Sequence, residues 1–525
     1  MGIDNETVEA IKSSPAGKHW EKIGISHHHG ICIPLFSLRS ESGLGIGEFT
    51  DLIPLSHWCR EIGMDVIQLL PLNDTGLDTS PYNAMSANAL NPLHLGLEYL
   101  PNYEETDEIY ALKKLNQSQR VDYENVKNLK IQFLRNYFDR HGQKIIASDS
   151  FQNFVQDIPW LRDYAIFKVL KIQNGWREWR LWDESIRTPT EKLLKQLEQD
   201  HFEEVTYHQF VQFLCFQQLH EVKVKANQNG VFIKGDIPIL ISPDSEEVWL
   251  HQDLFNLELS AGAPPDMYNK DGQTWGFPLF EWDKMKSNGY QWWRTRLHTA
   301  SKLYDIYRID HVVGFFRIWA VPHDKLPTEG HYVPKDHSQW FTDGRERLSM
   351  MLMSNKMLPI GEDLGTVPEK VHRMLEETGI CGTKFLMSLK VRKTLNTPFE
   401  FTPLSLTTVS THDSPTLDLW WKQYPEEVEV YCKIKNWKQG LLFSQEQRID
   451  ILHESHHSSS LFHINLLPEY LALFPELVWP NIEDERVNRP GILTDENWSI
   501  RYRPTLEQIV NHKGLKDLIK QILTP

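Results

Sequence analysis

Three acidic residues stand at the C-terminal ends of candidate strands of this 525-residue chain. Asp310 follows "YRI", Glu362 follows "LPIG" and Asp413 follows "VSTH". The first two are 52 residues apart and the last two 51, enough for about one or two strand–helix units in each interval. An ionised carboxylate, a protonated carboxylic acid and a third group that stabilises developing positive charge are what cleavage of a glycosidic bond with retention requires.

Polar neighbours accompany two of these acids. Arg308 lies two residues before Asp310, so both side chains share one face if the segment is a strand. A guanidinium there would keep Asp310 ionised and lower its pKa, as a carboxylate nucleophile requires. His311 follows Asp310 and His412 precedes Asp413. Imidazole N–H groups at these positions could donate hydrogen bonds to substrate hydroxyls.

Glu362 has a different setting, because the residues before it are apolar. Such a carboxyl group is expected to have a raised pKa and to act as a proton donor, whereas Asp363 is expected to cap or buttress the turn that follows. The bland alternative is that acids at strand ends only form turns or cap helices, and that lone histidines are surface residues. The residues alone therefore indicate carboxylate-based glycosyl chemistry and nothing more specific.

These acids need a scaffold that brings the ends of several strands together. Short β-rich apolar runs alternate with helical patterns, which predicts βαβ units and a parallel sheet. We expect strands within residues 30–36, 64–72, 231–240, 304–310, 357–363, 383–389 and 406–413. An eighth is expected near 467–474 or just beyond, so the count favours an α/β fold of the (β/α)8 TIM-barrel type over an open sheet. Such barrels collect their catalytic groups at the C-terminal ends of the strands.

The length of the chain permits either several domains or one enlarged barrel. The interval 100–229 carries helical patterns where a barrel needs only one helix. We therefore expect a helical subdomain inserted after the second strand, together with long loops at the rim. Because no internal repeat or Gly/Ser-rich linker interrupts the chain, a single catalytic domain over residues 1–525 is the simpler hypothesis.

The composition argues against several classes of partner. The net charge is −16, from 55 basic and 71 acidic residues without a block of Lys and Arg, which disfavours nucleic acid. The 18 tryptophans suit large cores or stacking against sugar rings. The N-terminal segment lacks an apolar signal region and no apolar run approaches 18 residues, so we expect a cytoplasmic protein that does not enter a membrane.

Neither a metal nor a cofactor is expected. The five cysteines are scattered without a C-x-x-C pair, which indicates neither disulfides nor a zinc ribbon. The triplet His27–His29 is interpreted as a polar lead-in to the first strand, because consecutive histidines point in different directions. No G-x-G-x-x-G follows that strand, which argues against a dinucleotide site.

Seven segments carry a resemblance to a known family. In chain order they read "TSPYNAMSANALNP", "KGDIPILISPDSEEVW", "AGAPPDMYNKDGQTWGFPLFEW", "YDIYRIDHVVGFF", "LPIGEDLGTVP", "VSTHDSPT" and "ERVNRPGILTDENW". They resemble signature segments of the 4-α-glucanotransferases (glycoside hydrolase family 77), the amylomaltase or disproportionating-enzyme relatives of the α-amylases, from about Ile31 to Arg501. The resemblance implies a (β/α)8 barrel that cuts an α-1,4-glucan with retention. It would then pass the piece to glucose or a maltooligosaccharide, without a cofactor.

Matched by position, the resemblance also implies roles for single residues. Asp310 would be the nucleophile, and Glu362 would protonate the departing sugar and then deprotonate the acceptor. Asp413 would bind hydroxyls of the distorted sugar and stabilise the transition state. Arg308 would accompany the nucleophile, and His412 would donate to a sugar hydroxyl.

Further substrate contacts are implied outside the strand ends. Tyr82 would stack on the sugar at the cleavage point, although a tyrosine in a proline-containing turn is the alternative. Asp236 would help to organise the site, and a buried structural aspartate is the competing interpretation. The segment Ala263–Gly276 matches a loop that arches over the cleft, from which Asp266 and Trp275 would contact the glucan and help to exclude water.

The chain departs from the family pattern at three places. Gly361 stands where A-E-D-L-G is usual, Phe277 stands where W-G-N-P is usual, and Ser414-Pro415 lies in "STHDSPT". The last two lie beside expected substrate contacts and bear on donor length and acceptor choice. Two alternatives stay open: an α-glucan hydrolase that uses the same carboxylates with water as acceptor, and a non-catalytic glucan-binding protein.

Overall fold

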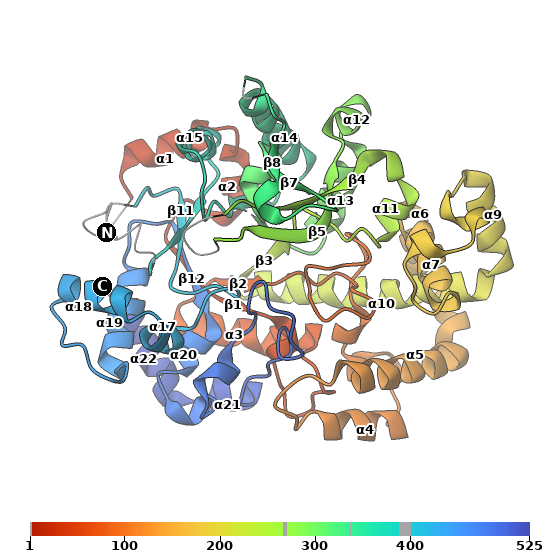
Figure 1. Cartoon of the computed structure of the whole chain (residues 1–525). Coiled ribbons are helices and arrows are strands. Elements are labelled where there is room, and N and C mark those ends of the chain that lie inside the picture. The colour runs from red at the N-terminus through yellow and green to blue at the C-terminus, as the bar shows by residue number, and fades with distance from the viewer. Residues whose placement is uncertain (1–2, 266–269, 337, 388–400) are drawn as a thin grey trace.

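Eight parallel strands form the centre of the protein (Figure 1). The computed structural model describes residues 3–265, 270–336, 338–387 and 401–525. In chain order the central strands are β1 (His28–Ile33), β2 (Val66–Leu69), β3 (Phe232–Ile237), β6 (Ile306–Ile309), β9 (Leu358–Gly361), β10 (Gly382–Phe385), β11 (Ser405–Thr408) and β12 (Phe462–Leu466). From β1 to β9 and from β10 to β12 each strand pairs with the next along the chain, and β12 pairs with β1.

The two strands at the edges of this sheet, β9 and β10, meet through a single bridge. Ile360 pairs with Cys381 in parallel, and the amide of Gly361 donates to the carbonyl of Cys381 at 2.8 Å. This contact closes the sheet into a barrel, so the predicted (β/α)8 fold is confirmed. A closed parallel barrel places the C-terminal ends of all eight strands at one face.

The predicted strand positions hold for seven of the eight strands. The eighth, β12, lies directly before the segment in which it was expected, and that segment begins with helix α20 (Leu467–Leu471). Pro468 is in the first turn of α20, where its fixed φ suits a helix start. Strand β12 carries His463 and Asn465, which are both buried, and these polar residues interrupt the apolar run that would have marked it.

Helices from the connections between strands cover the outside of the barrel (Figure 1). They are α3 (Leu52–Ile62), α10 (Phe202–Gln228), α13 (Gln291–Ser301), α14 (Trp340–Ser354), α15 (Glu369–Thr378) and α19 (Gln445–His456), with α22 (Lys513–Leu523) from the end of the chain. Further helices are α1 (Asn5–Ser13), α2 (Gly17–Ile23), α11 (Glu246–Leu250), α12 (Trp282–Ser287), α17 (Leu417–Gln423), α18 (Pro425–Lys435) and α21 (Leu506–Asn511). In the part of the chain that the structure describes, no helix is both long and apolar enough to cross a membrane.

The connection between β2 and β3 contains the extra helices on the right of Figure 1. They are α4 (Asp107–Leu115), α5 (Tyr123–Ile146), α6 (Asp149–Asp157), α7 (Leu161–Gln173), α8 (Glu184–Arg187) and α9 (Glu191–Asp200). Helix α10 follows them and packs on both α7 and the barrel elements α3 and β3. It thus belongs to the barrel and the helical segment alike, and the division into one domain with an inserted part stays a prediction.

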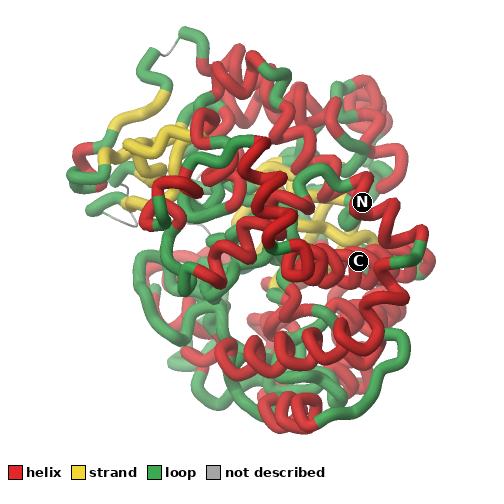
Figure 2. The backbone as a smooth tube through the Cα atoms, turned by 90° about the vertical axis from the view of Figure 1, so that its right-hand side faces the viewer, coloured by secondary structure: helices red, strands yellow, loops and turns green. Residues whose placement is uncertain are grey.

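A second sheet lies beside the barrel, set apart from the central strands in Figure 2. Its order is β5-β4-β7-β8, formed by β4 (Phe255–Ala263), β5 (Gln273–Phe280), β7 (Ile318–Pro322) and β8 (His331–Val333) in antiparallel pairs. The expected loop Ala263–Gly276 is therefore only partly a loop, because its last four residues belong to β5. At Gly262 a Cβ atom would stand 2.0 Å from the carbonyl oxygen of Gln273, so only glycine allows this close pairing.

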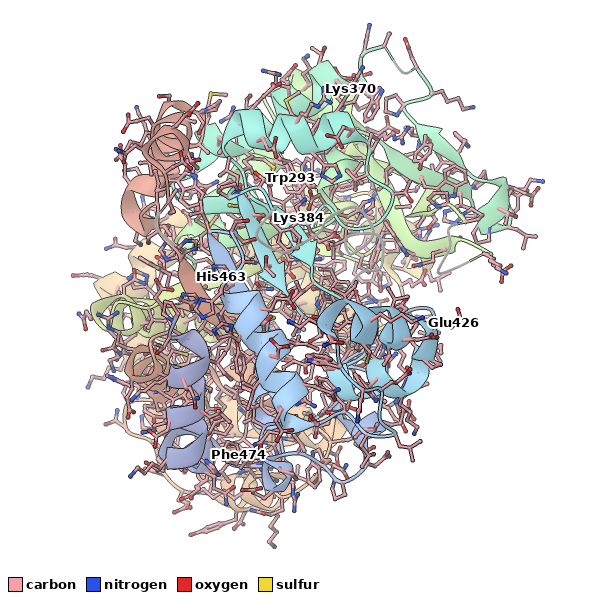
Figure 3. All side chains as sticks on the ribbon, turned by 90° about the vertical axis from the view of Figure 1, so that its left-hand side faces the viewer. Trp293, Lys370, Lys384, Glu426, His463 and Phe474 are labelled. Atoms are coloured by element: carbon pink, nitrogen blue, oxygen red, sulfur yellow. The ribbon has the colours of Figure 1, made fainter. Side chains whose placement is uncertain are left out.

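Buried histidines occupy the opposite, N-terminal end of the barrel. The Nδ1 atoms of His29 and His456 are 2.9 Å apart, and Nε2 of His456 is 2.6 Å from the hydroxyl of Tyr470. His463 (Figure 3) donates from Nδ1 to the carbonyl of Ser455 at 2.8 Å. Across the described ranges, no three His, Cys, Asp or Glu residues are placed to hold a metal ion. The first strand begins within the histidine triplet, at His28.

The buried histidines predict that the fold loses stability in mild acid. Burial lowers the pKa of His456 well below its ordinary value, and the neighbouring His29 and His463 add to this effect. The unfolded chain takes up a proton near pH 6.5 and the folded chain does not, so stability is complete above that pH and is lost as the pH falls. Between about pH 6.5 and 5.5 the cost from His456 alone is about 1 kcal/mol.

Urea unfolding at both pH values will measure this cost. His456→Gln should be less stable than wild type at pH 7, but its free energy of unfolding should fall by about 1 kcal/mol less on acidification. His57→Gln, a substitution at an exposed histidine, serves as the matched control and should follow wild type. An equal fall in wild type and His456→Gln would contradict the buried neutral state.

Candidate active site

The predicted site residues meet in a pocket of about 530 Å³ at the C-terminal ends of the strands. Eight of the ten line it: Tyr82, Trp275, Arg308, Asp310, His311, Glu362, His412 and Asp413. Asp236 is a ninth member of the group, bound to Arg308 and Tyr82 and 3 % exposed. Asp266 lies outside the described residues. Side chains from β3, β5 and β6 and from the segments directly after β2, β6, β9 and β11 thus converge at one place.

Arg308 contacts three carboxyl groups. Its Nη1 donates to Oδ1 of Asp310 at 2.7 Å and to both oxygens of Asp236 at 3.0 Å, and its Nη2 is 3.7 Å from Oε2 of Glu362. Arg308 and Asp310 share a face of β6, as the spacing predicted, and Arg308 pairs with Asp236 of β3 in the strand register. Burial opposes the charge of Arg308, but Asp236 and Asp310 outweigh it and raise its pKa. The guanidinium therefore stays cationic.

Glu362 is held by backbone amides. Its Oε2 accepts from the amide of His311 and its Oε1 from the amide of Leu364, both at 2.9 Å. Burial raises the pKa of Glu362 to about 7, Asp310 adds to the rise, and Arg308 opposes it. The carboxyl group is consequently protonated in a large share of molecules near neutral pH, as a proton donor requires.

His311 adopts a backbone conformation that is rare for a residue with a side chain. Its φ is 43° and its ψ is 56°, in the left-handed region. This turn aims the amide of His311 at Glu362, and the imidazole ring meets Trp275 edge-on with centroids 5.1 Å apart. Strain of this kind persists only where surrounding contacts enforce it, and it is concentrated at functional sites.

Asp363 has a different role from the one expected. It does not cap the turn after β9, because Glu362 itself accepts from Leu364 there. Instead Oδ1 of Asp363 accepts from the amide of Thr383 at 2.6 Å, and Oδ2 lies 2.6 Å from Nδ1 of His372. The two neighbouring acids therefore face opposite ways, one toward the pocket and the other toward β10 and α15.

Asp413 is fixed at the pocket wall by two neighbours. His412 Nε2 is 3.2 Å from Oδ2 of Asp413, and Asn488 Nδ2 donates to Oδ1 at 2.6 Å. Its side chain is 49 % exposed and open to the pocket. Burial would raise the pKa of Asp413, but the charge and hydrogen bond of His412 together with the bond from Asn488 lower it. Asp413 is therefore an ionised carboxylate.

Tyr82 joins the site through Asp236. Its hydroxyl donates to Oδ2 of Asp236 at 2.7 Å, and its ring stacks on His412 with centroids 5.2 Å apart. Trp498 lies on another side of Tyr82, with a centroid distance of 5.7 Å. The tyrosine is thus part of an aromatic wall and not simply a turn residue.

Sequence reasoning missed several residues of this site. Asn488 and Trp498 belong to the signature segment "ERVNRPGILTDENW", which was recognised as a whole without choosing a residue from it. The pocket floor is also polar: Lys234 Nζ, on a side chain that is almost fully buried, donates to Oε1 of Gln68 at 2.6 Å. Burial lowers the pKa of Lys234 to about 7. Its position two residues before Asp236 on β3 was the available signal.

The structure shows the surroundings of two departures from the family pattern, Gly361 and Phe277. A Cβ atom at Gly361 would meet only side-chain carbons of Leu375 and Val312 at ordinary contact distances of 3.4 Å, so alanine or glycine fits there. Phe277 lies where the pocket opens into a neighbouring cavity of about 850 Å³ and lines both. Its neighbour in the roof, Trp275, also lines both and donates from Nε1 to Oε1 of Gln273 at 3.0 Å.

A closed α/β barrel that gathers an arginine, three aspartates and a protonatable glutamate at its C-terminal face has the groups for carboxylate chemistry on glycosidic bonds. The profile of the 4-alpha-glucanotransferase family matches residues 33–507. The chain is 42 % identical to the 4-alpha-glucanotransferase of Chlamydia pneumoniae over 98 % of both chains, and 31 % identical to that of Synechocystis over 90 % of this chain and 94 % of the relative. The chain belongs to the 4-alpha-glucanotransferase family, as its signature segments predicted.

A solved structure agrees with this membership. The amylomaltase from Streptococcus agalactiae in complex with acarbose matches with a TM-score of 0.82 and 25 % identity, over 95 % of this chain and 99 % of that chain. The protein is accordingly an enzyme that transfers α-1,4-glucan segments between sugars, and this prediction is favoured over the hydrolase and the non-catalytic alternatives.

The raised pKa of Glu362 predicts the pH dependence of the reaction. If Glu362 acts as the proton donor that the sequence predicts, its protonated form is the active one, and kcat/KM for maltotriose should fall as the pH rises through about 7. Glu362→Gln should reduce kcat/KM for maltotriose by about 10²–10⁴-fold, the usual size of a general acid's contribution. The loss should be much smaller for α-maltosyl fluoride, whose leaving group needs no proton.

Initial rates with both donors across pH 5.5 to 8.5 provide the measurement. Two outcomes would refute the assignment of Glu362 as the acid: an equal loss of kcat/KM with the two donors, or a fall in kcat/KM at alkaline pH that persists in Glu362→Gln.

Proposed function

We propose that this transferase works by double displacement with Asp310 as nucleophile. A carboxylate oxygen of Asp310 attacks the anomeric carbon of the donor, the glycosidic C–O bond breaks, and the departing oxygen takes the proton of Glu362. The hydroxyl of an acceptor sugar then attacks the same carbon, its proton passes to Glu362, and the bond to Asp310 breaks. The observation that carries this proposal is the position of Arg308, which donates to Asp310 at 2.7 Å and lies 3.7 Å from Glu362, the carboxyl group with the raised pKa.

Asp413 and His412 are assigned to the sugar hydroxyls and the cationic transition state. A carboxylate that stays ionised beside the reacting carbon stabilises positive charge as the leaving group departs. His412 points its Nε2 atom at Asp413, so the pair offers an acceptor and a donor to neighbouring hydroxyls. His311 supplies its amide to Glu362, and a hydrogen-bonding ring to the pocket wall.

Tyr82, Asp236 and Trp275 are assigned to binding and orientation. Asp236 shares Arg308 with Asp310 and accepts from Tyr82, so it couples the aromatic wall to the nucleophile. Trp275 on β5 covers the pocket beside His311, where an indole can pack on a sugar and displace water. Asp266, which lies outside the described residues, keeps the role that the resemblance implies, contact with the glucan.

The substrates follow from the family and its relatives. We infer that donors are α-1,4-linked maltooligosaccharides or glycogen-derived glucans, and that acceptors are glucose or maltooligosaccharides. The relative whose structure was solved with acarbose supports a glucan-shaped site. A cytoplasmic location is proposed because all five cysteines are buried and unpaired, as in proteins of a reducing compartment.

Products from maltotriose distinguish transfer from hydrolysis. A ladder of longer maltooligosaccharides together with released glucose, separated by chromatography, is the expected result. Short products alone, with reducing ends rising in step, would instead assign water as the principal acceptor.

The nucleophile can be tested against a matched control on the same strand. Asp310→Asn should lower turnover by at least about 10³-fold, because the covalent step is lost, while binding of maltoheptaose measured by calorimetry persists. Asp305→Asn removes a buried carboxylate from the N-terminal end of the same strand segment, where residues serve stability. Its folded fraction should retain normal turnover, and turnover above a tenth of wild type in Asp310→Asn would refute the assignment.

A further inference from the structure

A buried glutamate behind the pocket binds both ends of the segment that carries Asp413. Glu469 is in α20, directly after β12, and its side chain is 0 % exposed. Its Oε1 accepts from the hydroxyl of Ser410 at 2.7 Å and from the amide of Leu417 at 3.1 Å. Ser410 and Leu417 flank the turn in which Asp413 lies, three residues before it and four residues after it. One carboxylate therefore sets the position of this turn from the side of the barrel.

A buried arginine holds that carboxylate in place. Nη1 of Arg448, on α19, donates to Oε2 of Glu469 at 3.0 Å, and its Nη2 binds Asp418. Arg448 is 3 % exposed. A buried ion pair is costly to desolvate and adds little stability unless its geometry and hydrogen bonds are complete. Here both carboxylate oxygens of Glu469 accept hydrogen bonds, so we interpret the ion pair as fixing the position of the turn.

The rest of the turn is held from the rim. The amide of Asn488 donates to the carbonyl of His412 at 3.1 Å and its side chain donates to Asp413. Within the turn, Ser414 Oγ accepts from the amide of Thr411 at 2.8 Å. These contacts shape the turn, whereas Glu469 joins it to the barrel. Glu469 itself is not one of the described residues that line the pocket.

We infer that Glu469, held by Arg448, is a positioning residue that places Asp413 for the transition state without touching the glucan. The inference rests on the role proposed for Asp413 above. Catalytic groups must be held within about 0.5 Å of the productive geometry by the contacts of neighbouring residues, and a misplacement of about 1 Å can cost about 10²-fold in rate. Glu469→Gln puts an amide N–H₂ group against either Arg448 or the donors of the turn, and so disturbs this placement.

A double-mutant cycle separates positioning from general support of the fold. Glu469→Gln should lower kcat/KM for α-maltosyl fluoride by about 10-fold to 10²-fold in the wild-type background. In the Asp413→Asn background it should change kcat/KM by less than about 2-fold, because its target is already lost. An equal fold loss in both backgrounds would overturn the inference. Normal activity of Asp413→Asn itself would instead refute the proposed role of Asp413. Failure of this inference and failure of the proposed function therefore give different results.

Binding provides a second readout. In an Asp310→Asn background, Glu469→Gln should leave the affinity for maltoheptaose within about 2-fold, since ground-state contacts elsewhere in the cleft are unchanged. A loss of affinity as large as the loss in kcat/KM would mean that Glu469 supports binding of the glucan in general, and the inference would fail.

Two further variants guard against a folding defect. Glu48→Gln is the matched control, because Glu48 is likewise buried and paired with a buried cation, Lys130, at 2.5 Å. It should reduce stability but leave kcat/KM unchanged in both backgrounds. If Glu469→Gln does not fold, Ser410→Ala removes a single hydrogen bond to Glu469. It should give a loss of about 3-fold to 10-fold in kcat/KM that disappears in Asp413→Asn, and persistence of that loss would overturn the inference.

Discussion

The site depends on one cation that serves three carboxyl groups. Arg308 binds Asp236 and Asp310 directly and reaches Glu362 at the edge of ion-pair distance. Three ionised carboxylates around one guanidinium would leave a net charge of −2 in a largely buried place, which a low-dielectric environment resists. Glu362 is the farthest of the three from Arg308, and burial raises its pKa to about 7, so it is the carboxyl group that holds a proton. Sharing a single arginine thus gives otherwise similar acids different settings, as the proposed division into a nucleophile and a proton donor requires.

The barrel makes this sharing possible through its register. Asp236 lies opposite Arg308 in the β3–β6 ladder, and Arg308 lies opposite Ile360 in the β6–β9 ladder. A slip of one residue in either ladder would turn the inward side chains outward. Register alone does not aim Glu362, because the amide that holds it belongs to the strained His311. The strand register therefore sets the level of the acids along the barrel axis, and the backbone distortion at His311 sets the direction of the Glu362 side chain.

The parts of the site that were predictable are those with a local signal. A spacing of two placed Arg308 and Asp310 on one face, and apolar runs marked the strands that end at the acids. Contacts between distant loops leave no such signal: Tyr82 meets Asp236 across 154 residues, and Asn488 meets Asp413 across 75. The resemblance supplied Tyr82 and Asp236 as site residues, but not their hydrogen bond. Strand β12 was displaced in the prediction because His463 and Asn465, which bond to Ser455 and Tyr470 of the helices outside the barrel, interrupt its apolar pattern.

Transfer in place of hydrolysis requires that a sugar hydroxyl outcompete water as the acceptor. The residues between the pocket with the acids and the neighbouring cavity bear on this competition. The pocket with the acids and the larger neighbouring cavity share Tyr82, Trp275, Phe277 and Trp498. These aromatic side chains come from the loop after β2, from the second sheet and from the rim segment that also carries Asn488, and none comes from a barrel strand. An acceptor sugar seated against them replaces many water molecules at once, while a single water gains little from aromatic walls. We therefore infer that the barrel itself can be common to hydrolases and transferases, and that aromatic residues attached to its rim favour a sugar acceptor over water.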